Sequence, residues 1–117
     1  MNAEEQKNLR RIYFEIITPT PLPTGEQVFI SGSDPTLGNW KPDGLPLTRV
    51  EDRVWKAEAV LPADHSVEYK ITRGSWDSEE VLPDGTVPSN YRISAGGDRI
   101  VRHTVLAWRD GRYGTET

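Results

Sequence analysis

The segments VWKAEAVL at residues 54–61 and VEYKIT at residues 67–72 decide the fold. The turn LPAD at residues 61–64 connects them. In both segments apolar and polar side chains alternate, a pattern typical of strands with one buried face. Trp55 stands on the apolar face of the first strand, so we predict that it lies in the core. The two strands and the short turn between them predict an antiparallel pair.

The same alternation assigns the side chains of residues 66–73 to two faces. Val67, Tyr69 and Ile71 are predicted to point inward, and Glu68, Lys70 and Thr72 to point outward. An outward lysine on a regular strand is ordinarily a solvated lysine, but it is also a candidate for contact with a ligand.

Further strands are expected on both sides of this pair, and no stretch has the spacing of an amphipathic helix. They are predicted at residues 9–18, 27–31, 47–49, 79–82, 91–94 and 99–108. Prolines and glycines punctuate the chain between them, most densely at residues 32–46 and 74–90. The pattern predicts an all-β protein, an antiparallel β-sandwich of seven to eight strands, with a barrel as the nearest alternative.

The length of 117 residues suits a single domain spanning residues 1–117. We expect frayed tails at residues 1–8 and 110–117, because both are polar. The last tryptophan, Trp108, ends the final strand and is predicted to pack in the core or at its edge.

Composition excludes several classes of function. The net charge of −4 argues against nucleic acid as a partner, and no apolar run is long enough to cross a membrane. The chain has no cysteine, which is compatible with either compartment. It has no secretory leader as written, which predicts a cytoplasmic protein, or an extracellular one if the chain is a fragment of a secreted protein.

Four pieces of the sequence, in order, resemble the starch-binding domains known as family 20 carbohydrate-binding modules and their relatives in other starch- and glycogen-binding families. They are VFISGS with LGNW at residues 28–40, VW running on to LPA at residues 54–63, VEYK at residues 67–70, and WR at residues 108–109. The resemblance implies an immunoglobulin-like β-sandwich that binds starch, glycogen or maltooligosaccharide without cleaving it. It also implies a parent or partner enzyme that acts on glycans.

In the resembled family, two tryptophans, a lysine and an asparagine form the sugar site. Matched by motif, Trp40 corresponds to the first tryptophan, Lys70 to the lysine and Asn90 to the asparagine. The family places its second tryptophan shortly before that asparagine, where this chain has no aromatic residue. Trp76 stands earlier and would fill the same space only if the loop of residues 74–90 folds back; otherwise it plugs the core.

These residue types suit a sugar ligand. A glucose ring has an apolar face of C–H groups, which stacks on an indole, and a rim of hydroxyls, which needs donors and acceptors. Lys70 offers donors and Asn90 offers both, while Glu79 and Glu80 are further candidate acceptors. The sequence predicts no cofactor, no metal site and no catalytic residues. His65 and His103 have no metal-binding spacing, and adjacent acidic pairs in turns rarely form a glycosidase pair.

Two other functions remain open at this stage. The chain could be a structural or protein-interaction sandwich that has lost its sugar site. An enzyme acting on sugars ranks last, since no nucleophile, base and orienting residue can be assembled from the sequence.

Overall fold

The computed structural model describes residues 8–114, and its regular structure is almost entirely β. The elements are β1 (Leu9–Ile17), β2 (Phe29–Gly32), the 3-10 helix η1 (Pro35–Leu37), β3 (Leu45–Pro46), β4 (Thr48–Glu51), β5 (Val54–Pro62), β6 (Val67–Thr72), the 3-10 helix η2 (Trp76–Ser78), β7 (Glu80–Val81), β8 (Tyr91–Ile93), β9 (Arg99–Thr104) and β10 (Ala107–Trp108). The described part thus has ten strands rather than seven or eight, because three of them are two-residue pairings.

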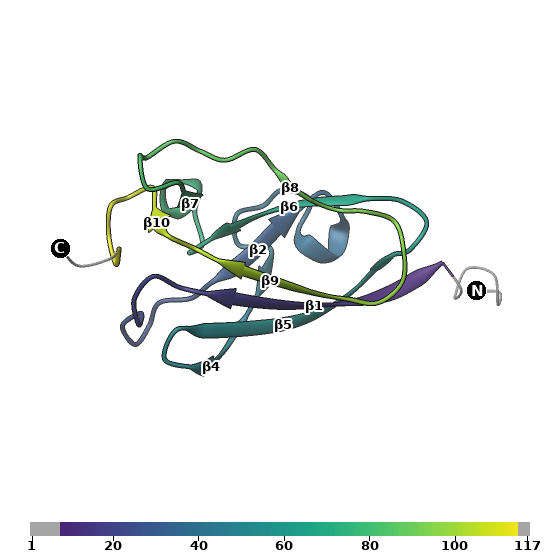
Figure 1. Ribbon diagram of the computed structural model, residues 1–117, viewed down its shortest axis with the longest axis horizontal. Coiled ribbons are helices and arrows are strands. Elements are labelled where there is room, and N and C mark those ends of the chain that lie inside the picture. The colour runs from purple at the N-terminus through teal and green to yellow at the C-terminus, as the bar shows by residue number, and fades with distance from the viewer. Residues whose placement is uncertain (1–7, 115–117) are drawn as a thin grey trace.

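Two four-stranded sheets form the sandwich. The first, here called the β1 sheet, has the order β4-β5-β1-β9, and the second, the β6 sheet, has the order β3-β2-β6-β8. Figure 1 shows β1, β5 and β4 in the lower part of the view and β2, β6 and β8 above them. A small pair, β7 with β10, lies at one end. The predicted all-β sandwich is confirmed.

The core lies between the inward faces of the two sheets. Alternate side chains of β1, namely Ile12, Phe14 and Ile16, are buried against Tyr69 and Ile71 of β6 and their neighbours. The rings of Phe14 and Tyr69 meet edge to face, with centroids 5.5 Å apart. In β5 and β6, the period-two pattern predicted correctly which face is buried, except at Thr72.

Trp55 and Trp108 are also core residues, as predicted, with only 3% and 2% of their surface exposed. Arg49 lies over the Trp55 ring at 4.8 Å from its centroid, and Arg73 lies over the Trp108 ring at 5.3 Å. Each buried indole is thus covered by a guanidinium group.

The purely antiparallel arrangement was wrong in one place, because β9 runs parallel to β1. The chain leaves β8 and reaches the start of β1 through the turn at residues 94–98, where Asp98 accepts a hydrogen bond from the backbone of Arg11 at 2.8 Å. From that end, β9 must run in the direction of β1. All other pairings in the three sheets are antiparallel.

The predicted last strand, residues 99–108, is divided in two. Val105 is buried and donates its backbone N–H to Ile17 at the end of β1, at 2.8 Å. The chain then leaves the β1 sheet, and Trp108 pairs with Glu80 of β7. The break allows Trp108 to close one end of the core.

Thr72 was predicted to point outward, but it is fully buried. Its hydroxyl donates to the carbonyl of Pro42 at 2.6 Å and accepts from the backbone of Gly74 at 2.9 Å. The loop between β2 and β3 therefore covers this end of β6, and Thr72 fastens the loop there.

Of the predicted frayed tails, residues 1–7 and 115–117 lie outside the described residues. Two residues of the described part of the C-terminal tail contact the rest of the fold. Asp110 pairs with Arg73, and the carbonyl of Tyr113 accepts a hydrogen bond from Thr20 at 2.9 Å. No helix within residues 8–114 has the length and apolar character needed to span a membrane.

Candidate functional site

A groove of about 390 Å³ opens on the outer side of the β6 sheet, and we call it the tryptophan groove. It is lined by Trp40, Lys70, Trp76, Glu79 and Asn90. The groove therefore contains all four predicted site residues, although they come from four separate segments of the chain, together with one of the two candidate acceptors.

Trp40 is presented by a compact turn that follows β2. Asp34 caps the short helix η1 by accepting from the backbone of Thr36 at 2.9 Å, and Leu37 anchors the turn in the core. Gly38 has a φ of 85°, and a Cβ there would lie 2.7 Å from the Cα of Gly44. Only glycine fits this conformation and this close approach, which explains the LGNW motif in physical terms.

The backbone at Trp40 is itself strained. Asn39 and Trp40 both adopt left-handed conformations, with φ of 51° and 68°. Such residues cost about 1 to 3 kcal/mol each and persist only where the surrounding structure holds them. Here the backbone N–H of Trp40 donates to the carbonyl of Gly32 at 2.8 Å. The strained turn keeps the indole half-buried at the groove.

Lys70 extends from the middle of β6 and is held by an acidic neighbour. Its Nζ lies 3.7 Å from a carboxylate oxygen of Glu79, and only 14% of its side chain is exposed. Glu79 is itself buried and lies 3.8 Å from Arg109. The ammonium group is therefore held in place rather than free in solvent, while its remaining donors can reach a ligand.

Trp76 reaches the groove because the loop after β6 folds back. Gly74 turns the chain with a φ of 112°. Ser75 and Ser78 then form a reciprocal capping box around η2, with their hydroxyls 3.0 Å apart. β7 follows directly and pairs with β10, which fixes the loop. Trp76 thus lies half-buried in the same groove as Trp40, rather than in the core.

Asn90 lies at the rim of the groove, just before β8. Its side-chain nitrogen donates to Glu68 at 3.0 Å, and the backbone of Glu68 donates to the hydroxyl of Ser33 at 3.1 Å. Sequence reasoning did not assign Glu68 a role. The available signal was its position two residues before Lys70, which places both side chains on the outward face of β6.

The two candidate acceptors lie on different sides of the backbone. Glu79 lines the groove, whereas Glu80 is buried on the other side of the backbone. Glu80 accepts from the Tyr91 hydroxyl at 2.6 Å and contacts Nε2 of His103 at 2.6 Å. Burial, together with this hydrogen bond, raises the pKa of Tyr91. Glu80 thus joins β7, β8 and β9 and does not contribute to the groove.

Among the described residues, no cluster of three or more potential ligands could hold a metal ion. What the groove offers is two indole rings, an ammonium group, a carboxylate and an amide. These groups can stack on apolar ring faces and hydrogen-bond to hydroxyls.

Comparison with known proteins gives consistent results. A family described as "Starch binding domain" matches residues 10–92. An α-amylase of Niallia circulans is 34% identical over 100 residues, which is 85% of this chain and 8% of the amylase. An amylopullulanase of Thermoanaerobacterium thermosulfurigenes is 26% identical over 105 residues, which is 86% of this chain and 6% of that enzyme. The chain thus spans less than a tenth of the length of these relatives.

Solved structures share the fold. A family 15 glucoamylase from Hypocrea jecorina superposes with a TM-score of 0.66 and 20% identity, over 88% of this chain and 18% of the glucoamylase. The family 20 carbohydrate-binding module of a maltotetraose-forming amylase from Pseudomonas saccharophila gives a TM-score of 0.59 and 22% identity, over 80% of this chain and 98% of that module. The second alignment matches a complete module with most of this chain.

Proposed function

The chain belongs to the starch-binding domain family, whose members are non-catalytic carbohydrate-binding modules, and from this premise we propose that it binds α-glucan chains in the tryptophan groove. The observation that supports this site best is that Trp40 and Trp76 line one groove, although they lie far apart in the sequence. Stacking on one indole alone would fall short of the free energy that a millimolar complex needs.

The energetics of stacking explain why two rings are needed. Covering roughly 100 Å² of one indole contributes about 2.5 kcal/mol at about 25 cal/mol per Å². A millimolar complex needs about 4 kcal/mol net, after association costs. Two platforms, with hydrogen bonds worth about 1 kcal/mol each, reach the millimolar to tens-of-micromolar range.

The polar groups suit the hydroxyl rim of a glucose unit. Lys70 supplies donors, and its ion pair with Glu79 reduces the entropy lost when a sugar binds. Asn90 is oriented by Glu68 and can offer a donor and an acceptor to a pair of hydroxyls. We propose that these two side chains hydrogen-bond to the hydroxyls of a glucose unit, while the indoles stack on the faces of the glucose rings.

The alternative is a sandwich that has the fold but no sugar site. Its main support was the missing aromatic residue just before Asn90. The position of Trp76 in the groove removes that support, because the second ring arrives from the opposite end of the loop.

We further propose, as finer points, that the ligand includes starch and glycogen and that the module attaches a glycan-acting enzyme to its substrate. The names of the relatives, an α-amylase and an amylopullulanase, support an enzyme partner. They do not support the cytoplasmic prediction, so we propose the extracellular alternative for the compartment.

Titration with maltoheptaose, followed by tryptophan fluorescence, tests the site. Trp55 and Trp108 are buried, so we expect the signal to come from Trp40 and Trp76. The parent chain should show a saturable change, and Trp40→Ala and Trp76→Ala should each weaken binding at least about tenfold, or about 1.4 kcal/mol. Leu106→Ala, at an exposed residue outside the groove, is the matched control. No response in the parent would favour the sandwich without a site.

A further inference from the structure

Four side chains gather behind the tryptophan groove, on the inner side of the strands that carry it, and we call them the Glu80 cluster. They come from β6, β7, β8 and β9 in turn, and are Tyr69, Glu80, Tyr91 and His103. The buried Glu80 carboxylate accepts from the Tyr91 hydroxyl and from Nε2 of His103, both at 2.6 Å. The Tyr91 ring packs on the other two rings, with centroids 5.4 Å from Tyr69 and 4.5 Å from His103. The cluster thus joins both large sheets and the small pair β7–β10 at one point.

The polar residues of the groove are direct sequence neighbours of this cluster. The pairs are Tyr69 with Lys70, Glu79 with Glu80, and Asn90 with Tyr91. Adjacent residues of an extended chain point to opposite sides, so one side chain of each pair faces the cluster and the other faces the groove. A displacement of the cluster would therefore displace the groove side chains with it.

The segment that carries Trp76 depends most on this connection. It consists of η2, Glu79 and β7, and within residues 8–114 β7 pairs with β10 and with no strand of either large sheet. The side chain of Glu80 reaches from this segment to β8 in one large sheet and to β9 in the other. Because Trp76 lies just before Glu80 in the chain, these hydrogen bonds fix the place of its ring.

The hydrogen bonds of the cluster favour one geometry. A carboxylate can only accept, so Nε2 of His103 carries the proton that points at Glu80. Burial, together with the hydrogen bond to Glu80, raises the pKa of Tyr91, so its hydroxyl remains a donor at neutral pH. Hydrogen bonds to a charged group are stronger than neutral ones, and a buried one left unmade is costly. The cluster is therefore a rigid support for the groove.

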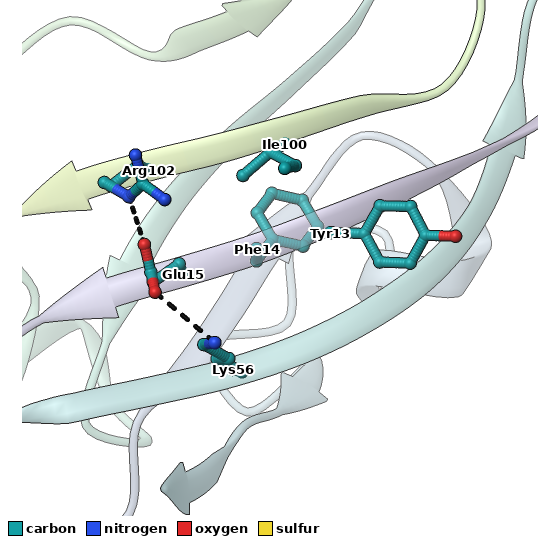
Figure 2. A pocket seen from close by; sticks show the side chains of 6 residues that line it. All are labelled: Tyr13, Phe14, Glu15, Lys56, Ile100 and Arg102. Atoms are coloured by element: carbon teal, nitrogen blue, oxygen red, sulfur yellow. Dashed lines mark hydrogen bonds and ion pairs between the residues drawn. The ribbon is translucent and has the colours of Figure 1, made fainter. Parts of the chain in front are cut away.

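The opposite face of β9 has a similar ion pair that does not reach the groove. Figure 2 shows Arg102 of β9 beside Glu15 of β1 on the outer face of the β1 sheet, where the guanidinium donates to the carboxylate. Arg102 and His103 are neighbours in sequence, so a carboxylate holds β9 on each face. None of the residues drawn in Figure 2 lines the tryptophan groove. Arg102 therefore offers a matched control.

We infer that Glu80 is a positioning residue for the tryptophan groove, because its hydrogen bonds hold the segment that carries Trp76 at a fixed distance from the rim at Asn90. Glu80 contributes no atom to the groove itself and does not touch the sugar. The inference deepens the proposed function and rests on it for the identity of the ligand. Two rings add their stacking energies only where both meet the same glucan chain, so the support that fixes their spacing decides the affinity.

The indole N–H resonances of the free protein test the positioning without a ligand. Glu80→Gln keeps the size of the side chain but has one accepting oxygen in place of two, so it satisfies only one of its donors. Tyr91→Phe keeps the ring and removes the other partner of that hydrogen bond. Each variant should move the NMR resonance of the Trp76 indole and leave that of Trp40 in place. Arg102→Gln, the control on the outer face of β9, should move neither.

Titration with maltoheptaose tests the consequence for binding, on samples whose urea unfolding curves begin at the folded baseline. Glu80→Gln and Tyr91→Phe should each weaken binding about fivefold, or about 1 kcal/mol, whereas Arg102→Gln should bind as the parent does. In a Trp76→Ala background, the same changes should weaken binding by less than about twofold, because the ring that the cluster positions is gone. Tyr91→Phe carries the test alone if Glu80→Gln does not fold.

The outcomes separate this inference from the proposed function. If the parent binds and the Trp76 resonance stays in place in the cluster variants, the positioning role is wrong and the proposed function stands. An equal loss of affinity with and without the Trp76 ring would also overturn it, because the cluster would then act through general destabilisation. If the parent does not respond to maltoheptaose, the proposed function is wrong, and the Trp76 resonance in the free variants still decides whether Glu80 positions the groove.

Discussion

The four tryptophans of this chain fall into two pairs that the structure uses in opposite ways. Trp55 and Trp108 lie on strands and are buried beneath arginines, with indole N–H groups that have no hydrogen-bond partner among the described residues. Trp40 follows the short 3-10 helix η1 and Trp76 begins η2, and both line an open groove. The side chain is the same, so the backbone that presents it decides its role.

The difference has a physical cause. On a strand, the alternation of faces forces one side chain in two toward the core. A loop has no such rule, and an exposed indole there must be held by specific local features. For Trp40 these are two glycines in close approach and a strained backbone. The comparison predicts that the two pairs respond oppositely to substitution, with stability affected in one and binding in the other.

The largest effect is expected for Trp55→Ala. Removing a buried aromatic side chain and leaving a cavity costs about 3 to 5 kcal/mol. Urea unfolding should show this loss, whereas the folded fraction of the variant should bind maltoheptaose as the parent does. A variant with parent-like stability would mean that Trp55 does not support the core.

The next effect concerns the arginine that covers the other core tryptophan. Arg73 has 3% of its side chain exposed, pairs with Glu26 and Asp110, and lies over Trp108. Arg73→Leu should lower the free energy of unfolding by about 2 to 3 kcal/mol, because both partner carboxylates lose their cation. The loss is limited because these carboxylates are partly exposed to water. Arg112→Leu, at an exposed arginine nearby, is the control, and urea midpoints compare the two. Equal urea midpoints for the two variants would show that the ion pairs of Arg73 do not stabilise the fold.

The groove pair should give the reverse result. Trp40→Ala should weaken maltoheptaose binding at least about tenfold, or about 1.4 kcal/mol, while unfolding stability changes by less than about 1 kcal/mol. Calorimetric titration and urea unfolding of the same sample measure both. A large loss of stability without loss of binding would place Trp40 with the core tryptophans.

The sequence predicted much of this contrast, and its limits are physical. Alternation correctly predicted that Trp55 is buried and that Lys70 points outward, because the face of a strand residue depends only on local periodicity. It could not show that β9 runs parallel to β1, since strand neighbours are set by long-range packing. Thr72 was misplaced for the same reason, because the cover over it comes from a loop thirty residues away in the chain.

The candidate site shows a similar division. Trp40, Lys70 and Asn90 were found through the order of short motifs, and the structure brings them together. The position of Trp76 stayed open in the sequence because it depends on the pairing of β7 with β10. Glu79 and Glu80 are adjacent and chemically alike, so only the path of the backbone separates the groove carboxylate from the buried one.

A smaller effect tests the ion pair in the groove. Lys70→Met keeps the length of the side chain but removes its donors, and it should weaken binding by about 1 kcal/mol, the worth of one hydrogen bond. It also leaves Glu79 with Arg109 alone, which lowers stability. The double variant Lys70→Met/Glu79→Gln should restore stability without restoring binding. Recovery of both would show that Lys70 acts only through Glu79.

The smallest effect compares glycine with alanine at one residue of each pair. At position 40 the φ of 68° strains any residue with a Cβ by about 1 to 2 kcal/mol, whereas glycine adds about 0.5 to 1 kcal/mol of unfolded-state entropy. Trp40→Gly should therefore be about 0.5 kcal/mol more stable than Trp40→Ala. Position 55 is an ordinary strand residue, so Trp55→Gly should be less stable than Trp55→Ala by about 0.5 to 1 kcal/mol. Urea unfolding of the four variants gives both differences, and the same sign at both positions would show that the Trp40 backbone is not strained.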